Sequence, residues 1–122
     1  MSATSSPSPP DMPFTHVMAG ALVSDLAAAE EWYAVLFDRP PWTRPMDGLL
    51  EWYLPGGSGV QVYRNPTLAG HGSLVLRVDD LDAEAARLRT ATLVDGEVEG
   101  GGGGRILRLS DPDGNSVVLV GT

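Results

Sequence analysis

The chain has 122 residues, a length that suits one domain with a single core. Its net charge of −8 gives an acidic surface that repels nucleic-acid phosphates, and no apolar run approaches the roughly 20 residues that span a bilayer. The absence of cysteine excludes disulfides, thiolate nucleophiles and cysteine metal sites. We therefore expect a cytoplasmic protein with no nucleic-acid partner and no membrane partner.

The N-terminal segment, residues 1–12, is rich in Ser and Pro and lacks the basic and apolar stretches of a signal peptide. A segment this polar cannot bury enough apolar surface to offset the entropy lost on ordering. We expect residues 1–12 to form a disordered tail and residues 13–122 to form one folded domain.

The domain is expected to begin with a strand at residues 16–23, where apolar side chains recur at every second position. A helix should follow, with Ser24 or Asp25 as its N-cap and with an end before Pro40. Its apolar stripe comprises Leu26, Ala29, Tyr33 and Leu36. Three short strands are then expected near Trp42–Arg44, Leu49–Leu54 and Val60–Arg64.

The second half repeats the first at an offset of 55 residues, which relates His16 to His71 and Asp25 to Asp80. We expect a strand at residues 73–78 and a helix that Asp80 or Asp82 caps. The inward face of that helix comprises Leu81, Ala85 and Leu88. Three later strands of the second half are expected near Leu93–Val98, Ile106–Ser110 and Ser116–Val120. Gly100–Gly104 separates the first two, and the turn Asp111–Asn115 separates the last two.

These elements predict an α+β fold of two βαβββ modules, at about residues 13–66 and 70–122. Four sequences carry a family resemblance: Val-Ser-Asp-Leu, Glu-Trp-Tyr-Ala-Val-Leu-Phe, Val-Asp-Asp-Leu and Asp-Pro-Asp-Gly-Asn-Ser-Val-Val-Leu-Val. Over residues 14–121 the chain resembles the vicinal-oxygen-chelate superfamily of glyoxalases, fosfomycin-resistance enzymes, extradiol dioxygenases and bleomycin-binding proteins. The resemblance implies a homodimer, and a cupped mixed sheet with the helices outside.

The resemblance also implies where metal-dependent members place their ligands, on the first and last strands of each module. The family's usual set is His, Glu, His and Glu, and the matching positions here are Met18, Gln61, Ser73 and Val118. A thioether, an amide, a hydroxyl and an alkyl group supply neither imidazole nor carboxylate to a divalent metal. We therefore expect the metal-free branch of the superfamily, with no cofactor.

A different metal site would use the two histidines. His16 and His71 each lie two residues before a ligand position, and a bulge in each strand would bring them inward. Glu51 is then the best candidate for a carboxylate ligand. In the simpler alternative, both histidines lie near strand starts and are partly solvated.

The expected cavity lining comprises Met18, Trp42, Trp52, Gln61, Tyr63, Ser73, Arg77 and Val118, with Tyr53 and Met46 beside it. Aromatic rings with a few polar groups suit a flat organic ligand, although core packing is the alternative for about half of these residues. Arg77 either anchors an anionic ligand or pairs internally with Glu51 or an Asp. The helix aromatics Trp32, Tyr33 and Phe37 are expected in the core or an interface.

The function expected first is metal-independent binding of a small molecule, with sequestration of an aromatic or cationic compound as in resistance proteins. The alternative is an enzyme of the lyase, isomerase or dioxygenase-like type. It would use a metal on His16 and His71, or metal-free acid–base chemistry on Arg77, Tyr63 or a histidine. A third hypothesis is an interaction module whose own side chains fill the cup. Free sheet edges favour a homodimer.

Overall fold

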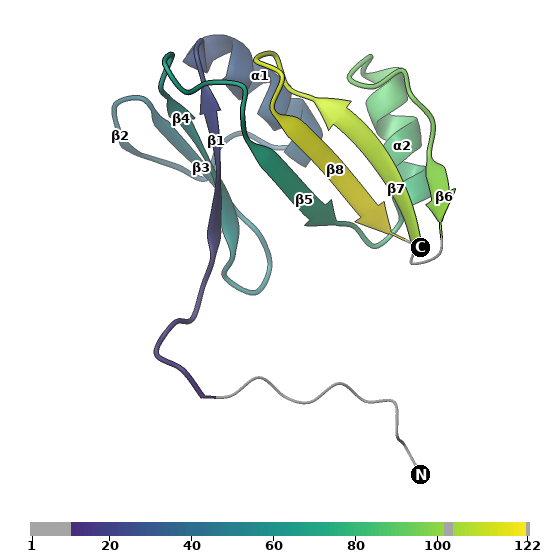
Figure 1. Cartoon of the computed structure of the whole chain (residues 1–122), viewed down its shortest axis with the longest axis horizontal. Coiled ribbons are helices and arrows are strands. Elements are labelled where there is room, and N and C mark those ends of the chain that lie inside the picture. Colours follow the sequence, from purple (N-terminus) through teal and green to yellow (C-terminus); the bar gives the residue numbers. More distant parts are fainter. Residues whose placement is uncertain (1–10, 102–103, 122) are drawn as a thin grey trace.

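The computed structural model describes residues 11–101 and 104–121. Its elements are β1 (Met18–Val23), α1 (Leu26–Phe37), β2 (Thr43–Met46), β3 (Leu49–Tyr53), β4 (Gly59–Arg64), β5 (Ser73–Arg77), α2 (Leu81–Thr90), β6 (Glu99–Gly101), β7 (Gly104–Ser110) and β8 (Ser116–Gly121). They form two mixed sheets with strand orders β1-β4-β3-β2 and β5-β8-β7-β6, and both helices lie behind the sheets (Figure 1). The predicted α+β fold of two βαβββ modules is confirmed.

The N-terminal tail predicted at residues 1–12 falls almost wholly outside the described residues. Within the described part of the chain, neither helix is both long and apolar enough to cross a bilayer.

Each helix begins at an aspartate that follows the first strand of its module. The Asp25 carboxylate accepts a hydrogen bond from the Ala28 backbone N–H at 3.1 Å, and Asp80 accepts one from Ala83 at 3.0 Å. Of the two candidates for each cap, the structure therefore selects Asp25 and Asp80 rather than Ser24 and Asp82. The stripes predicted from helical spacing are buried, apart from the half-buried Leu26.

One predicted strand is wrong. Residues 93–98 do not form a strand, although Leu93, Val94 and Val98 pack half-buried against the core. The strand that pairs antiparallel with β7 is β6, at Glu99–Gly101, which extends into the glycine run that was expected only to separate strands. Pairing with β7 thus decides the position of β6, against the low strand propensity of glycine. Residues 102 and 103 of the same run lie outside the described residues.

The two modules are joined by a buried polar turn between β7 and β8. The Asp111 carboxylate accepts hydrogen bonds from the Tyr33 hydroxyl of α1 at 2.7 Å and from the Asn115 amide at 2.8 Å. The same amide donates to the Leu22 carbonyl in β1, and the Asn115 oxygen accepts from the Gly72 N–H. This side-chain network therefore fixes β1 and α1 of the first module against β5 and β8 of the second.

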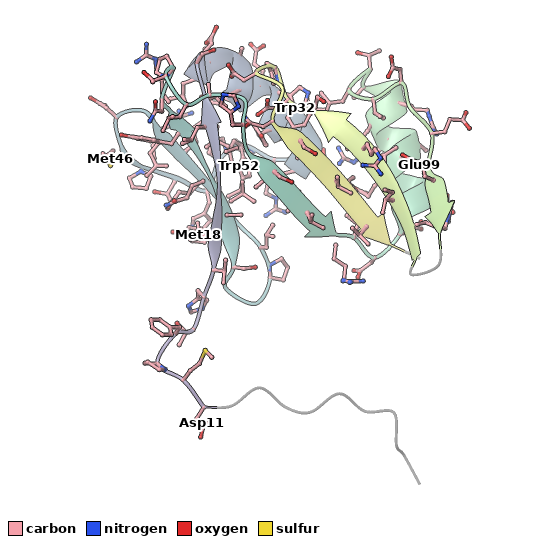
Figure 2. The ribbon with its side chains drawn as sticks, in the orientation of Figure 1. Asp11, Met18, Trp32, Met46, Trp52 and Glu99 are labelled. Carbon is pink, nitrogen blue, oxygen red and sulfur yellow. The ribbon has the colours of Figure 1, made fainter. Side chains whose placement is uncertain are left out.

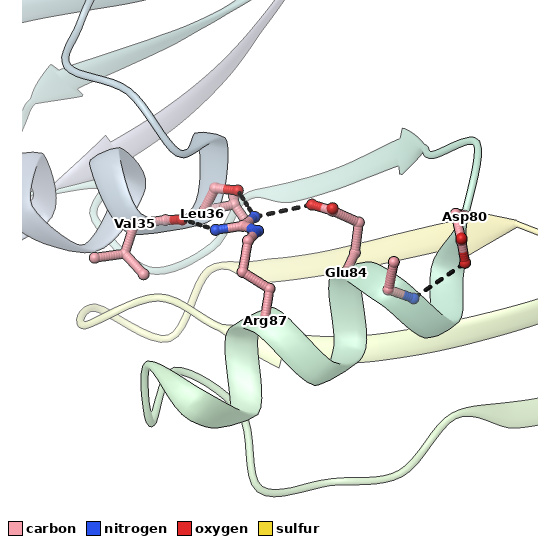
Figure 3. A network of polar contacts seen from close by, with 6 residues as sticks. Val35, Leu36, Asp80, Glu84 and Arg87 are labelled. Atoms are coloured by element: carbon pink, nitrogen blue, oxygen red, sulfur yellow. Dashed lines mark hydrogen bonds and ion pairs between the residues drawn. The ribbon is translucent and has the colours of Figure 1, made fainter.

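A second joint lies between the helices (Figure 3). The Arg87 guanidinium of α2 donates to the last carbonyls of α1, at 2.6 Å to Val35 and 2.7 Å to Leu36. Glu84, one turn earlier in α2, accepts from the same guanidinium at 2.9 Å. A cation at a helix C-terminus satisfies carbonyls that lack partners within the helix, so Arg87 stabilises α1 from the other module.

We expect Asp111→Ala to lower the free energy of unfolding by about 3 kcal/mol or more, because it leaves the buried Tyr33 and Asn115 donors without their acceptor. Asp95→Ala is the matched control, since Asp95 is exposed and its loss should change stability by less than about 0.5 kcal/mol. Urea denaturation followed by circular dichroism measures both. Equal stability of the two variants would contradict the bridging role of Asp111.

Candidate functional site

The strands present one face to the helices and the opposite face to solvent. In β3, Leu50 and Trp52 point to the core, so that Glu51 and Tyr53 point away from the helices. We call this outward surface the cup face. It includes Met18, Gly20, Thr43, Glu51, Tyr53, Gln61, Tyr63, Ser73, Val75, Arg77 and Val118.

Glu51 is the buried charged residue of the cup face, with 6% of its surface exposed. One of its oxygens accepts a hydrogen bond from the Tyr53 hydroxyl at 2.8 Å, and the other accepts from the Gln61 amide at 2.5 Å. Gly20 lies beside Gln61 in the register with β1, and a Cβ there would meet no atom within 4 Å. The Glu51 carboxylate, held by two donors, thus lies across the strands from Gln61 and Gly20, and the space above Gly20 is open.

Aromatic rings border this carboxylate. Tyr53 and Tyr63 are exposed, as is Trp42 at 69%, and the rings of Trp42 and Tyr53 meet edge-on with a centroid separation of 6.3 Å. The hydrogen bond to Glu51 raises the pKa of the Tyr53 phenol, and partial desolvation and the charge of Glu51 add to it. Tyr53 is therefore a neutral donor to Glu51 at neutral pH.

The four positions that match the family's metal ligands all lie on the cup face. Met18 lies at the start of β1 (Figure 2), where its thioether covers Gly59 so closely that a side chain there would clash. The Gln61 amide donates its hydrogen bond to Glu51, while Ser73 in β5 and Val118 in β8 belong to the second sheet. Residues 11–101 and 104–121 contain no group of three or more His, Asp or Glu side chains that could hold a metal. The donor set does not fit a divalent ion.

The alternative site of His16, His71 and Glu51 is not assembled by the fold, which corrects that hypothesis. The His16 ring lies over Gly57, just before the start of β1. His71 follows Gly70, whose N–H donates to the Leu22 carbonyl near the end of β1. The two imidazoles therefore lie at opposite ends of one strand, because β1 and β5 place their starts at opposite ends of the molecule (Figure 1).

Trp52 is a second correction, since it was expected in the cavity lining. Only 1% of its surface is exposed, and its ring packs on the helix side of β3 at 5.4 Å from Phe37. The indole N–H donates to the Arg39 carbonyl at 3.0 Å. The alternation of Leu-Leu-Glu-Trp-Tyr is the signal that could have placed Trp52 in the core and Glu51 on the cup face.

A hollow that the sequence did not predict lies where the two modules diverge, and we call it the seam groove. Its walls are Leu54, Pro55 and Ser58 of the β3–β4 hairpin, residues 75–80 at the end of β5, and Glu84. It has a volume of about 740 Å³ and continues into an apolar cavity of about 160 Å³. Of the residues expected to line a cavity, only Arg77 lies here.

We expect Glu51→Gln to lower the pKa of the Tyr53 phenol toward its usual value of about 10, because the variant removes the charge that holds the phenolic proton. Titration of phenolate absorbance at alkaline pH measures the shift. The variant Tyr53→Phe lacks this phenol, so the part of the titration curve that is lost in it belongs to Tyr53. An unchanged titration curve in Glu51→Gln would contradict the hydrogen bond.

The comparisons place this architecture among known proteins. The family model of the Glyoxalase/Bleomycin resistance protein/Dioxygenase superfamily matches residues 11–119. No curated protein matches the chain at significant similarity.

Solved structures align over nearly the full chain. A glyoxalase/bleomycin resistance protein from Catenulispora acidiphila is 28% identical with a TM-score of 0.82, covering 89% of this chain and 99% of its own. TnmS3, an antibiotic-binding protein from Streptomyces sp. CB03234, is 28% identical with a TM-score of 0.78, covering 91% and 98%. A bleomycin resistance determinant encoded on transposon Tn5 shares the fold at 21% identity, with a TM-score of 0.73 and coverage of 86% and 95%.

Proposed function

Because the chain belongs to the Glyoxalase/Bleomycin resistance protein/Dioxygenase superfamily, we propose that it binds a small organic molecule on its cup face without a metal. The observation that carries this proposal is the buried Glu51 carboxylate, held by Tyr53 and Gln61 and bordered by exposed aromatic rings. The similarity to an antibiotic-binding protein at 28% identity supports it.

The proposed guest is aromatic and cationic. Flat rings stack on the exposed faces of Trp42 and Tyr63, while a positive group approaches Glu51 across the space that Gly20 leaves open. The Tyr53 and Gln61 donors orient the carboxylate, whose remaining lone pairs face the guest. A net charge of −8 favours the encounter with a cation.

The mechanism is sequestration. The affinity comes from buried aromatic surface and one oriented charge interaction, and no bond in the guest is broken. We further propose that the protein acts in the cytoplasm as a homodimer. Two apolar side chains left exposed on or beside the cup face, Met46 and Val75, are the surface that a second copy would cover.

Metal-free acid–base catalysis is the second candidate, which the Glu51–Tyr53 hydrogen bond favours. In that case the carboxylate would accept a substrate proton. Turnover that persists in the presence of a chelator and disappears in Glu51→Gln would show that the protein is an enzyme rather than a sequestering protein.

Calorimetric titration with metal-free bleomycin and a panel of cationic aromatic antibiotics tests the binding proposal. We expect at least one guest to bind, and Glu51→Gln to weaken that guest about tenfold or more, because a desolvated charge interaction is lost. Glu97→Gln is the matched control, since Glu97 is an exposed loop residue. This variant should bind the guest with the affinity of the wild type. Equal affinities of both variants would contradict the role of Glu51.

A further inference from the structure

The seam groove carries the features of a second binding site at the edge of the cup face, with which it shares Val75 and Arg77. Its inner cavity lies between the two modules, and its apolar lining comprises Leu36, Phe37, Leu54, Leu76, Val78 and Leu119. These side chains come from the end of α1, the β3–β4 hairpin, β5 and β8. An apolar cavity of about 150 Å³ holds a benzene ring, so 160 Å³ matches a phenyl-sized group.

Two charged residues, Arg77 and Glu84, line the inner cavity. Glu84 is already compensated, since it accepts from the Arg87 guanidinium at 2.9 Å. Arg77 is exposed at the end of β5, and its guanidinium forms no hydrogen bond or ion pair with any described residue. The uncompensated charge at this cavity is therefore positive.

The outer groove also has two aspartates, which do not border the inner cavity. Asp80 is committed to the N-cap of α2, and Asp79 is exposed beside it. Of the charged residues that line the inner cavity, Arg77 is the one without a charged partner among the described residues, and an apolar lining beside one cation complements a carboxylate on an apolar group.

We propose that the seam groove binds aryl-substituted carboxylates, with the ring in the inner cavity and the carboxylate on the Arg77 guanidinium. The guanidinium binds a carboxylate through two parallel N–H donors. This guest has the opposite charge to the one proposed for the cup face, and Glu51 is not among the groove residues. Arg77 belongs to both surfaces, but the two proposed guests bind different charged groups, Glu51 on the cup face and Arg77 in the groove.

Titration of the full chain with 3-phenylpropionate, followed by calorimetry and by amide chemical shifts, tests the proposal. We expect submillimolar binding, with the largest shifts at residues 36–37, 54–58 and 75–78. Arg77→Gln should weaken it at least tenfold, and so should replacement of the probe by the neutral 3-phenylpropionamide. Arg64→Gln is the matched control, an exposed strand-end arginine away from the groove, and should bind as the wild type does.

Leu54→Trp tests the inner cavity, because the larger side chain would fill the space of the phenyl ring and abolish binding. Circular dichroism establishes that each variant is folded. Glu51→Gln should leave 3-phenylpropionate binding unchanged, so failure of the cup-face proposal is distinguishable from failure of this one. Absence of binding at millimolar probe, or wild-type affinity in Arg77→Gln, would overturn the proposal.

Discussion

The hydrogen bonds of one buried carboxylate, Asp111, hold the two modules in register. Asp111 fixes the Tyr33 hydroxyl of α1 and the Asn115 amide, and Asn115 in turn bonds β1 and the segment before β5. Burial and Asp111 raise the pKa of Tyr33 well above its usual range, so this donor stays protonated. Because every partner is paired, the network can be buried without the cost of an unsatisfied polar group.

The relative placement of the modules creates both candidate sites. Joined near the Asp111 turn, the edge strands β1 and β5 diverge toward the other end of the molecule (Figure 1). The divergence opens the seam groove, while the outward strand faces remain available as the cup face. The two surfaces differ in chemistry, since the first sheet presents the Glu51 carboxylate, whereas the inner cavity of the groove has Arg77 beside apolar side chains.

Local patterns in the sequence predicted most of the fold, since caps and alternation act over a few residues. The helices, their buried stripes and all strands but β6 follow from such patterns, whereas β6 depends on pairing with β7 across a glycine run. The candidate site was less predictable. The separation of His16 from His71 and the existence of the seam groove depend on how two modules meet. The placement of Trp52 was readable from alternation with Glu51.

We propose that this member of the superfamily binds its guest without a divalent metal, because Met18, Gln61, Ser73 and Val118 occupy the positions that match the ligands of metal-dependent members. Calorimetric titration of chelator-stripped protein with Mn²⁺, Fe²⁺, Co²⁺, Ni²⁺ and Zn²⁺ tests it most directly. The account predicts no binding tighter than about millimolar, near −4 kcal/mol. Stoichiometric micromolar binding that disappears in His16→Ala or His71→Ala would contradict it.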